Sequence, residues 1–388
     1  MGERQALGLW ASESRKGRLS RQPFSRGKVS QLDLNDATKS YEAWLISATV
    51  IHQKHLLRKH ERMKKDLFAF FRATFYRWIQ VWPEVCPDLT SAPEVLAVGD
   101  LHPENFGTWR DQEGRLVWGV NDFDEAFPLP YTNDLVRLAA GVALAIGDDQ
   151  LSLKPKEACD VILAGYLEGL ESGGQPFVLE EEHKGLRAMA FGSERNPRRF
   201  WKKLLSHERL KGGVPQAVGE IFRQVMPETK SPPQYFLRMS GLGGLGRLRV
   251  VAVTECSGGN IAREVKALAP SACAWAGIGG TTRILYPTIV KNAVRSRDPF
   301  LQVKDSWLVR RLSPHCCRIE LEELPKSRDE YHLLHAMGWE TANIHLGSAE
   351  NLTAIKRYLT KREPSWLRDA ADGMVKATEY DWKDWKNS

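Results

Sequence analysis

Four polar side chains, Asp100, Asn105, Asp122 and Asp124, could together bind a metal ion and phosphate. The first two bracket one loop, and the two later aspartates follow an apolar run beyond the turn sequence DQEG. Short apolar runs on either side of such a turn predict a β-hairpin, which would place the two groups beside each other. Asp100 could then orient a hydroxyl group, while the other three side chains hold a divalent cation against phosphate oxygens, with Asp124 as a further ligand.

His102 opens an alternative, because the segment Asp100-Leu101-His102 could also begin the ligand set of a two-metal phosphoesterase. Such a site needs further clusters of Asp, Asn and His downstream. The sequence contains no Gly-Asn-His motif and no second Asp-rich turn beyond residues 147–149. A role for His102 in orienting the loop through hydrogen bonds is the better interpretation.

The loop GDLHPEN at residues 99–105 resembles the HGDLHxxN loop of the aminoglycoside and choline kinase-like phosphotransferases, with Val98 where their first histidine usually stands. The spacing from Asp100 to Asn105 matches the catalytic loop of protein kinases. Asp122, in NDFD, occupies the place of the aspartate that opens their DFG segment. The resemblance implies a kinase-like fold that uses ATP and Mg²⁺.

The same stretch also resembles a bacterial family classed as a domain of unknown function, which is marked by GDxHxxNFG and NDFDEA. FAFFR at residues 68–72 contributes to this similarity, which extends from about Tyr41 to the C-terminus. Asp134, in YTNDLVRLAAG, resembles the aspartate at the start of the following helix in the small-molecule kinases. These resemblances imply a fold and do not identify a substrate.

A second informative stretch, MSGLGGLGRLRVV from residue 239, contains Gly241, Gly243, Gly244 and Gly246 ahead of a β-rich run. Glycines in a turn between strands let backbone amides approach phosphates, and Lys266 on the next predicted strand could contact the α- and β-phosphates of a nucleotide. A dinucleotide-binding site fits less well, because no helix pattern follows the glycines.

The order of these motifs is unusual, because in kinases the glycine loop and the lysine precede the catalytic loop, whereas here they follow Asp100. This order predicts a circularly permuted arrangement, which is physically allowed because a site requires spatial convergence and not a particular chain order. It also predicts that Lys266 lies within salt-bridge range of the Asp122 carboxylate. Lys304 competes for the lysine role, although it better suits a later strand of the lobe.

One departure from kinases concerns the glutamate that pairs with their lysine. The candidate helix at residues 281–297 contains no acidic residue, so Glu264 or Glu320 would have to substitute, or the pair is absent. Further along the chain, residues 322–325 form a candidate hinge whose backbone groups could contact an adenine.

Composition favours an ordinary globular protein: 388 residues, 42% hydrophobic and 27% charged, give enough length for two lobes. No run approaches the roughly 18 apolar residues that span a bilayer, and the N-terminus lacks the apolar core of a signal peptide. We therefore expect a cytoplasmic protein without a membrane partner. The six cysteines have no zinc-ligand spacing, which favours reduced thiols.

The net charge of +7 is unevenly spread, since the first 30 residues hold seven Lys or Arg against two glutamates. This polar arm lacks hydrophobic periodicity and is expected to be flexible. Nucleic-acid binding is disfavoured, because no aromatic residues alternate with the basic ones. A helix is expected from residue 36 or 40 through ERM, with His55, Lys59 and their basic neighbours at a solvated end, and a second helix over residues 65–81.

Together these patterns predict an α+β, two-lobed, circularly permuted kinase-like fold with four parts. They are a basic arm at residues 1–35, a mainly helical catalytic lobe at 36–230, a β-rich nucleotide-binding lobe at 231–325 and helices at 326–388 that pack on the catalytic lobe. The expected activity is phosphoryl transfer from Mg-ATP to a small-molecule hydroxyl. Two alternatives remain open: a nucleotide-binding regulatory pseudokinase, and a kinase-fold enzyme that transfers AMP to protein.

Overall fold

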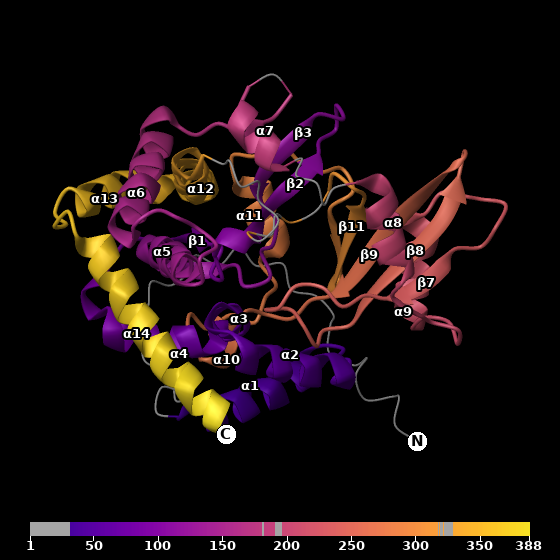
Figure 1. Ribbon diagram of the computed structural model, residues 1–388, viewed down its shortest axis with the longest axis horizontal. Helices are drawn as coiled ribbons and strands as arrows, with labels where there is room; N and C mark the ends of the chain where they lie inside the picture. The colour runs from indigo at the N-terminus through magenta and orange to yellow at the C-terminus, as the bar shows by residue number, and fades with distance from the viewer. Residues whose placement is uncertain (1–31, 181, 191–195, 317, 319–320, 322–328) are drawn as a thin grey trace.

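The structure, a computed structural model, describes residues 32–180, 182–190, 196–316, 318, 321 and 329–388. A six-stranded antiparallel sheet lies beside a larger, mainly helical part (Figure 1). The predicted mixed α+β class is therefore confirmed. Nearly all of the predicted basic arm lies outside the described residues, as do Glu320 and the candidate hinge at 322–325.

The N-terminal helices are interrupted where the sequence predicts continuous ones. Two pairs of helices replace the two expected helices: α1 (Leu34–Ala48) with α2 (Gln53–Lys65), and α3 (Leu67–Ala73) with α4 (Phe75–Val85). The first break occurs because the backbone between α1 and α2 pairs with the glycine-rich stretch. Leu248 N donates to Val50 O at 2.9 Å, and His52 N donates to Gly246 O at 2.7 Å.

The predicted solvated end of the first helix is wrong for His55 and Lys59. Both side chains are buried, Lys59 with only 3% exposed, because α2 packs on α3 and on the C-terminal helix α14 (Trp366–Asn387). Burial lowers the pKa of Lys59 to about 8.

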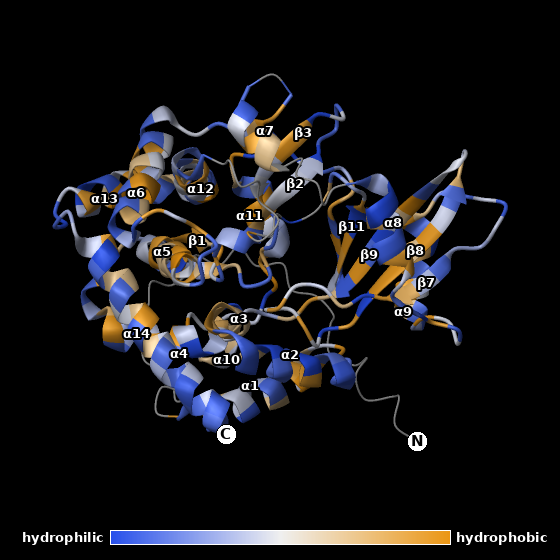
Figure 2. Cartoon of the chain, in the orientation of Figure 1, coloured by the Kyte–Doolittle hydropathy of each residue, from blue (hydrophilic) through white to orange (hydrophobic). Residues whose placement is uncertain are grey.

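The predicted hairpin is confirmed as β2 (Phe106–Arg110) and β3 (Leu116–Val120), with Phe106 opposite Val120. β3 also pairs with the short β5 (Phe177–Val178). β1 (Glu94–Ala97), which precedes the hairpin in the chain, pairs with β4 (Phe127–Pro130), which follows it. The chain then enters α5 (Tyr131–Gly147), in which nearly every side chain is buried. Figure 2 shows hydrophobic residues along α5, as expected for a helix inside a core.

The six-stranded sheet has the strand order β10-β11-β9-β8-β7-β6. Its strands are β6 (Glu208–Arg209), β7 (Gln234–Leu237), β8 (Arg249–Cys256), β9 (Gly259–Ala267), β10 (Gln302–Lys304) and β11 (Trp307–Leu312). On one face, α9 (Gln216–Val225) packs Val218 and Phe222 against sheet residues that include Val250 and Val265. Leu204 of α8 (Pro197–Leu205) packs on the other face. Both helices precede the expected lobe boundary at residue 230, yet both pack on this sheet.

The remaining helices surround α5 and the hairpin: α6 (Pro155–Ser172), α7 (Lys184–Ala190), α10 (Ala272–Trp275), α11 (Tyr286–Asn292), α12 (Glu330–His345) and α13 (Leu352–Leu359). α11 is shorter than the helix predicted for residues 281–297. α12 packs closely on α6, and α14 packs along α5. Among the described residues, no helix is long and apolar enough to cross a membrane.

Glycines allow the close crossing of α6 and α12. A Cβ atom at Gly165 would overlap the carbonyl oxygen of His335, and one at Gly338 would overlap that of Ile162. The helix backbones therefore meet without intervening side chains, and α12 also contacts β3.

We expect Gly338→Ala to lower the free energy of unfolding by about 1–3 kcal/mol, because the added methyl group must push the two helices apart. Gly147→Ala is the matched control: nothing lies within 4 Å of a Cβ at that position, so its stability should be unchanged or slightly higher. Urea denaturation of both variants measures the difference. Equal stabilities would contradict the close crossing.

Candidate functional site

One side-chain amide connects the two loops of the candidate site. Asn105 Nδ2 donates to the Asp100 carbonyl oxygen at 3.0 Å and to the Asp122 carbonyl oxygen at 3.1 Å. The backbone supports the same junction, because Asn121 N donates to Asn105 O at 2.8 Å. Both side-chain bonds use the amide nitrogen, which leaves Asn105 Oδ1 as the atom that could coordinate a cation.

The backbone of the Asp100 loop is held by a buried carboxylate of α5. Asp134 Oδ2 accepts from Val98 N at 2.7 Å, and Asp134 Oδ1 accepts from Gly99 N at 2.9 Å. His345 of α12 lies 3.1 Å from Asp134 and 2.9 Å from the Tyr166 hydroxyl. This network anchors the loop to three helices, and it gives the sequence-predicted Asp134 a clear structural contact.

Asp100 has one oxygen bound and the other turned toward the glycine loop. Arg137 donates to Asp100 Oδ1 through Nε at 2.8 Å and through Nη2 at 2.6 Å. The Arg137 guanidinium is itself buried against the Phe71 ring, 3.9 Å from the ring centre. Asp100 Oδ2 lies 3.1 Å from the position of a Cβ at Gly243. Burial raises the pKa of Asp100, although Arg137 opposes this change.

Lys266 of β9 meets both aspartates of the hairpin. Its Nζ lies 3.4 Å from Asp122 Oδ2 and forms a close ion pair with Asp124 Oδ2. The predicted proximity of Lys266 to Asp122 is thus found. Arg247, next to the glycine loop, adds a second cation, since its Nη1 donates to Asp124 Oδ2 at 2.8 Å and its Nη2 to Glu125 at 3.1 Å.

The two aspartates differ in their electrostatics. The side chain of Asp122 is 43% exposed toward the pocket, but the surrounding protein still displaces water, and this burial together with the neighbouring Asp124 carboxylate raises the pKa of Asp122. Burial also disfavours ionised Asp124, but Lys266 and Arg247 outweigh it and hold the pKa of Asp124 well below its usual range. Of the two aspartates, Asp124 is the one whose charged form the neighbouring cations favour.

The predicted glycine loop connects β7 to β8 and lies directly over these carboxylates. A Cβ at Gly244 would lie 3.4 Å from Asp124 Oδ2 and from Lys266 Nζ. Gly241 and Gly246 have φ angles of +71° and +108°, a region that favours glycine. The leucines between the glycines, Leu242 and Leu245, are buried in a cluster with residues of α1, α2, α3 and α14. The helical part therefore holds the loop in place.

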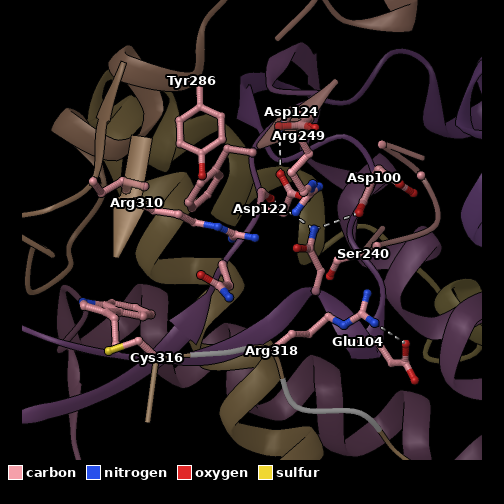
Figure 3. A pocket seen from close by; sticks show the side chains of 18 of the residues that line it. Asp100, Glu104, Asp122, Asp124, Ser240, Arg249, Tyr286, Arg310, Cys316 and Arg318 are labelled. Atoms are coloured by element: carbon pink, nitrogen blue, oxygen red, sulfur yellow. Dashed lines mark hydrogen bonds and ion pairs between the residues drawn. The ribbon is translucent and has the colours of Figure 1, made fainter. Parts of the chain in front are cut away.

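One pocket between the hairpin and the sheet is lined by Asp100, Asn105, Asp122, Asp124, Arg247 and the glycines Gly241, Gly243 and Gly244. Lys266 is buried and reaches this pocket through its ion pairs with Asp122 and Asp124. Figure 3 shows Asp100, Asp122 and Asp124 on one side of it and Arg310 entering from the sheet. Lys304, the competing lysine, instead contacts Gln224 of α9 away from the pocket. The sequence-predicted residues thus converge at or directly beside the pocket, except Gly246, which lies against Leu56 of α2, and the alternative Lys304.

Asn105, Asp122 and Asp124 fit a magnesium site. Asp124 Oδ1 is buried without a hydrogen-bond partner among the described residues, so it is available to a cation. Within the same part of the chain, no group of three or more His, Cys, Asp or Glu side chains could hold a metal ion by itself. Mg²⁺ commonly uses one or two carboxylates and takes its other ligands from water and substrate phosphates, which suits this set.

Sequence reasoning missed Arg137, Arg247 and Glu125. An arginine inside the otherwise apolar segment YTNDLVRLAAGVALAIG was a signal for Arg137, because a buried guanidinium requires an acidic partner. Glu125 also accepts from Ala272 N at 2.7 Å and so fixes the start of α10. Nothing in the spacing of Arg247 and Glu125 indicated that they would meet.

We expect Asp134→Asn to destabilise the fold by about 1–3 kcal/mol, because one buried amide proton of Val98 or Gly99 would lose its acceptor. Asp160→Asn, the same isosteric change on an exposed position of α6, serves as the control. Thermal and urea denaturation measure both. A stability equal to that of the wild type would show that Asp134 does not support the loop.

A family model described as an uncharacterized protein conserved in bacteria (DUF2252) matches residues 52–203. No curated protein and no solved structure matches the chain. The match supports the predicted family resemblance over this segment, which contains Asp100, Asn105, Asp122 and Asp124. The match ends before the glycine loop and Lys266. The matched segment therefore contains the carboxylate-bearing part of the pocket.

Proposed function

We propose that this protein is a phosphotransferase of kinase-like, circularly permuted fold that uses ATP and Mg²⁺ to phosphorylate a small-molecule hydroxyl. One observation carries the proposal: the glycine loop lines the same pocket as Asp122 and Asp124, and the buried Lys266 forms ion pairs with both aspartates, although the glycine loop and Lys266 lie far along the chain from the Asp100 loop.

The local order of the sheet supports this fold assignment. The glycine loop joins two antiparallel strands, β7 and β8, and the lysine lies on the next strand, β9. Kinases use the same local order for the loop that covers the phosphates and for the lysine that contacts them. Only the position of this unit relative to the Asp100 loop differs, which is why we propose a permutation.

The residues divide the chemistry among them. Bound Mg²⁺ would neutralise charge on the phosphates. Asn105 Oδ1 with Asp122 and Asp124 would hold that ion, while Lys266 and the glycine-loop amides bind phosphate oxygens. As the acceptor oxygen forms its bond to the γ-phosphorus and the bond to ADP breaks, Asp100 Oδ2 takes the hydroxyl proton. Arg137 keeps the other Asp100 oxygen fixed throughout.

A regulatory, non-catalytic nucleotide-binding protein is the second candidate. It is favoured by Lys266, whose ion pairs among the described residues are with two aspartates and not with a helix glutamate. Glu264, one suggested substitute, is instead bound by three arginines. Incubation with ATP labelled at the γ- or α-phosphate separates the candidates. Transfer of γ-label to a small molecule supports the phosphotransferase, retention of α-label on protein supports AMP transfer, and ATP binding without transfer supports regulation.

Asp122→Asn should abolish the Mg²⁺ dependence of ATP binding while the fold persists, because it removes a metal ligand without changing side-chain shape. Calorimetric titration of ATP with and without Mg²⁺ measures this. Asp305→Asn, in the exposed turn between β10 and β11, is the matched control and should behave as wild type. An unchanged Mg²⁺ dependence in the Asp122 variant would refute the metal assignment.

Asp100→Asn should spare the affinity for Mg-ATP and reduce turnover by about 10²–10⁴-fold, because a general base acts in the chemical step more than in ground-state binding. The γ-label transfer assay and the same calorimetric titration supply the two readouts. If the Asp100 and Asp122 variants lose ATP affinity equally, the division of roles between these residues is wrong.

A further inference from the structure

Three arginines, two from strands and one from just after a strand, converge on one buried carboxylate beside the proposed phosphate site. Glu264 of β9 has no exposed side-chain surface. It accepts from Arg249 Nη1 of β8 at 3.1 Å, from Arg310 Nε of β11 at 2.8 Å, and from Arg238 Nη1, just after β7. Register explains the convergence, because Arg310 lies directly opposite Glu264 and Arg249 directly opposite Lys266.

This cluster carries more positive charge than its own carboxylate balances. One arginine would neutralise Glu264, yet three surround it, and Arg249 and Arg310 also interact with the Asp122 carboxylate across the pocket. Because Asp122 is already paired with Lys266, the arginines and the lysine together still outnumber these two carboxylates. The arginines also hold the pKa of Glu264 well below its usual range in spite of burial, so the carboxylate stays charged. Surplus charge in a partly buried position is unfavourable unless an anion accompanies it.

The arginines retain donors that face the pocket. All three line it, whereas Glu264 lies beneath them. Arg310 uses Nε to bind Glu264, so its two terminal nitrogens are not needed for that bond. Figure 3 shows the Arg310 side chain extending from the sheet across the pocket toward Asp122. Arg249 Nη2 lies 3.7 Å from the position of a Cβ at Gly241, which places it beside the glycine loop.

We propose that Arg238, Arg249 and Arg310, positioned by Glu264, form a subsite for a phosphate group other than the one transferred. The planar fork of a guanidinium matches phosphate oxygens in pairs, which is why arginine suits this ligand better than lysine. Glu264 and Lys266 are two residues apart on β9, so their Cα atoms lie roughly 7 Å apart along the strand. That spacing allows a second phosphate within one substrate complex.

This ligand assignment rests on the proposed phosphotransferase function, and the phosphate has two sources. It belongs either to the nucleotide or to an acceptor that already carries a phosphate. Both present negatively charged phosphate oxygens, and the binding experiment can be arranged to separate the two sources.

The test is titration of the full-length protein with inorganic pyrophosphate in the absence of divalent ions. Arg310→Gln and Arg249→Gln should each weaken binding by about tenfold or more, since each removes charge-assisted hydrogen bonds. Arg223→Gln, the same charge change on the exposed side of α9, should bind like wild type. Arg310→Lys keeps the charge but loses the fork, and it should give an intermediate affinity, which provides a second variant if Arg310→Gln folds poorly. Pyrophosphate affinity unchanged in folded Arg310 variants would overturn the proposal.

Two further titrations of Arg310→Gln identify the source. A loss of ATP affinity as large as the loss of pyrophosphate affinity assigns the subsite to the nucleotide. Retained ATP affinity with loss of binding to a sugar phosphate assigns it to a phosphorylated acceptor. Because the pyrophosphate assay needs neither Mg²⁺ nor transfer, a protein without phosphotransferase activity could still pass it. Failure of the subsite is therefore distinguishable from failure of the proposed function.

Discussion

The charges buried between the sheet and the hairpin must neutralise each other, and the arrangement of the pocket depends on this requirement. Lys266 and Arg247 come from the sheet side, whereas Asp124 and Glu125 come from the end of the hairpin. Removing any of these ions from water without its partner would cost several kcal/mol, so the two parts of the chain are held in one relative position. The apolar anchoring of Leu242 and Leu245 acts in the same direction and brings the glycine loop onto the helical part.

A second set of contacts makes the Asp100 loop rigid before any ligand arrives. Asp134 satisfies two consecutive backbone amides, and Arg137, one helical turn later, holds the Asp100 carboxylate. One buried helix, α5, thus supplies both the support of the loop backbone and the orientation of its acidic side chain. Groups fixed in this way need little reorganisation during a reaction, which is the property expected of a site for charge-dependent chemistry.

The pocket is lined by ionic groups to an extent that bears on its ligand. Ligand sites in proteins are usually mostly apolar with a few polar groups, yet here the sheet presents Arg249 and Arg310 around Glu264 beside Lys266. Such a surface recognises phosphate oxygens more readily than an uncharged ring. The proposed transfer chemistry and the proposed second phosphate subsite are therefore consistent with each other, since both place phosphate groups along the same face of β9.

The sequence alone determined the local features whose physics is local. The turn DQEG and its flanking apolar runs predicted the β2–β3 hairpin, the spacing of Asp100 and Asn105 predicted a shared loop, and alternating strands placed Lys266 near the glycines. The breaks at residues 49–52 and at Thr74 could not be read from helical periodicity, because the first break results from hydrogen bonds to a segment some 200 residues later. For the same reason only the tertiary structure decided that Arg137 binds Asp100, that Arg247 joins Asp124, and that three arginines share Glu264. Each of these pairings brings together charges from separate elements, and burial makes them necessary only once the elements have packed.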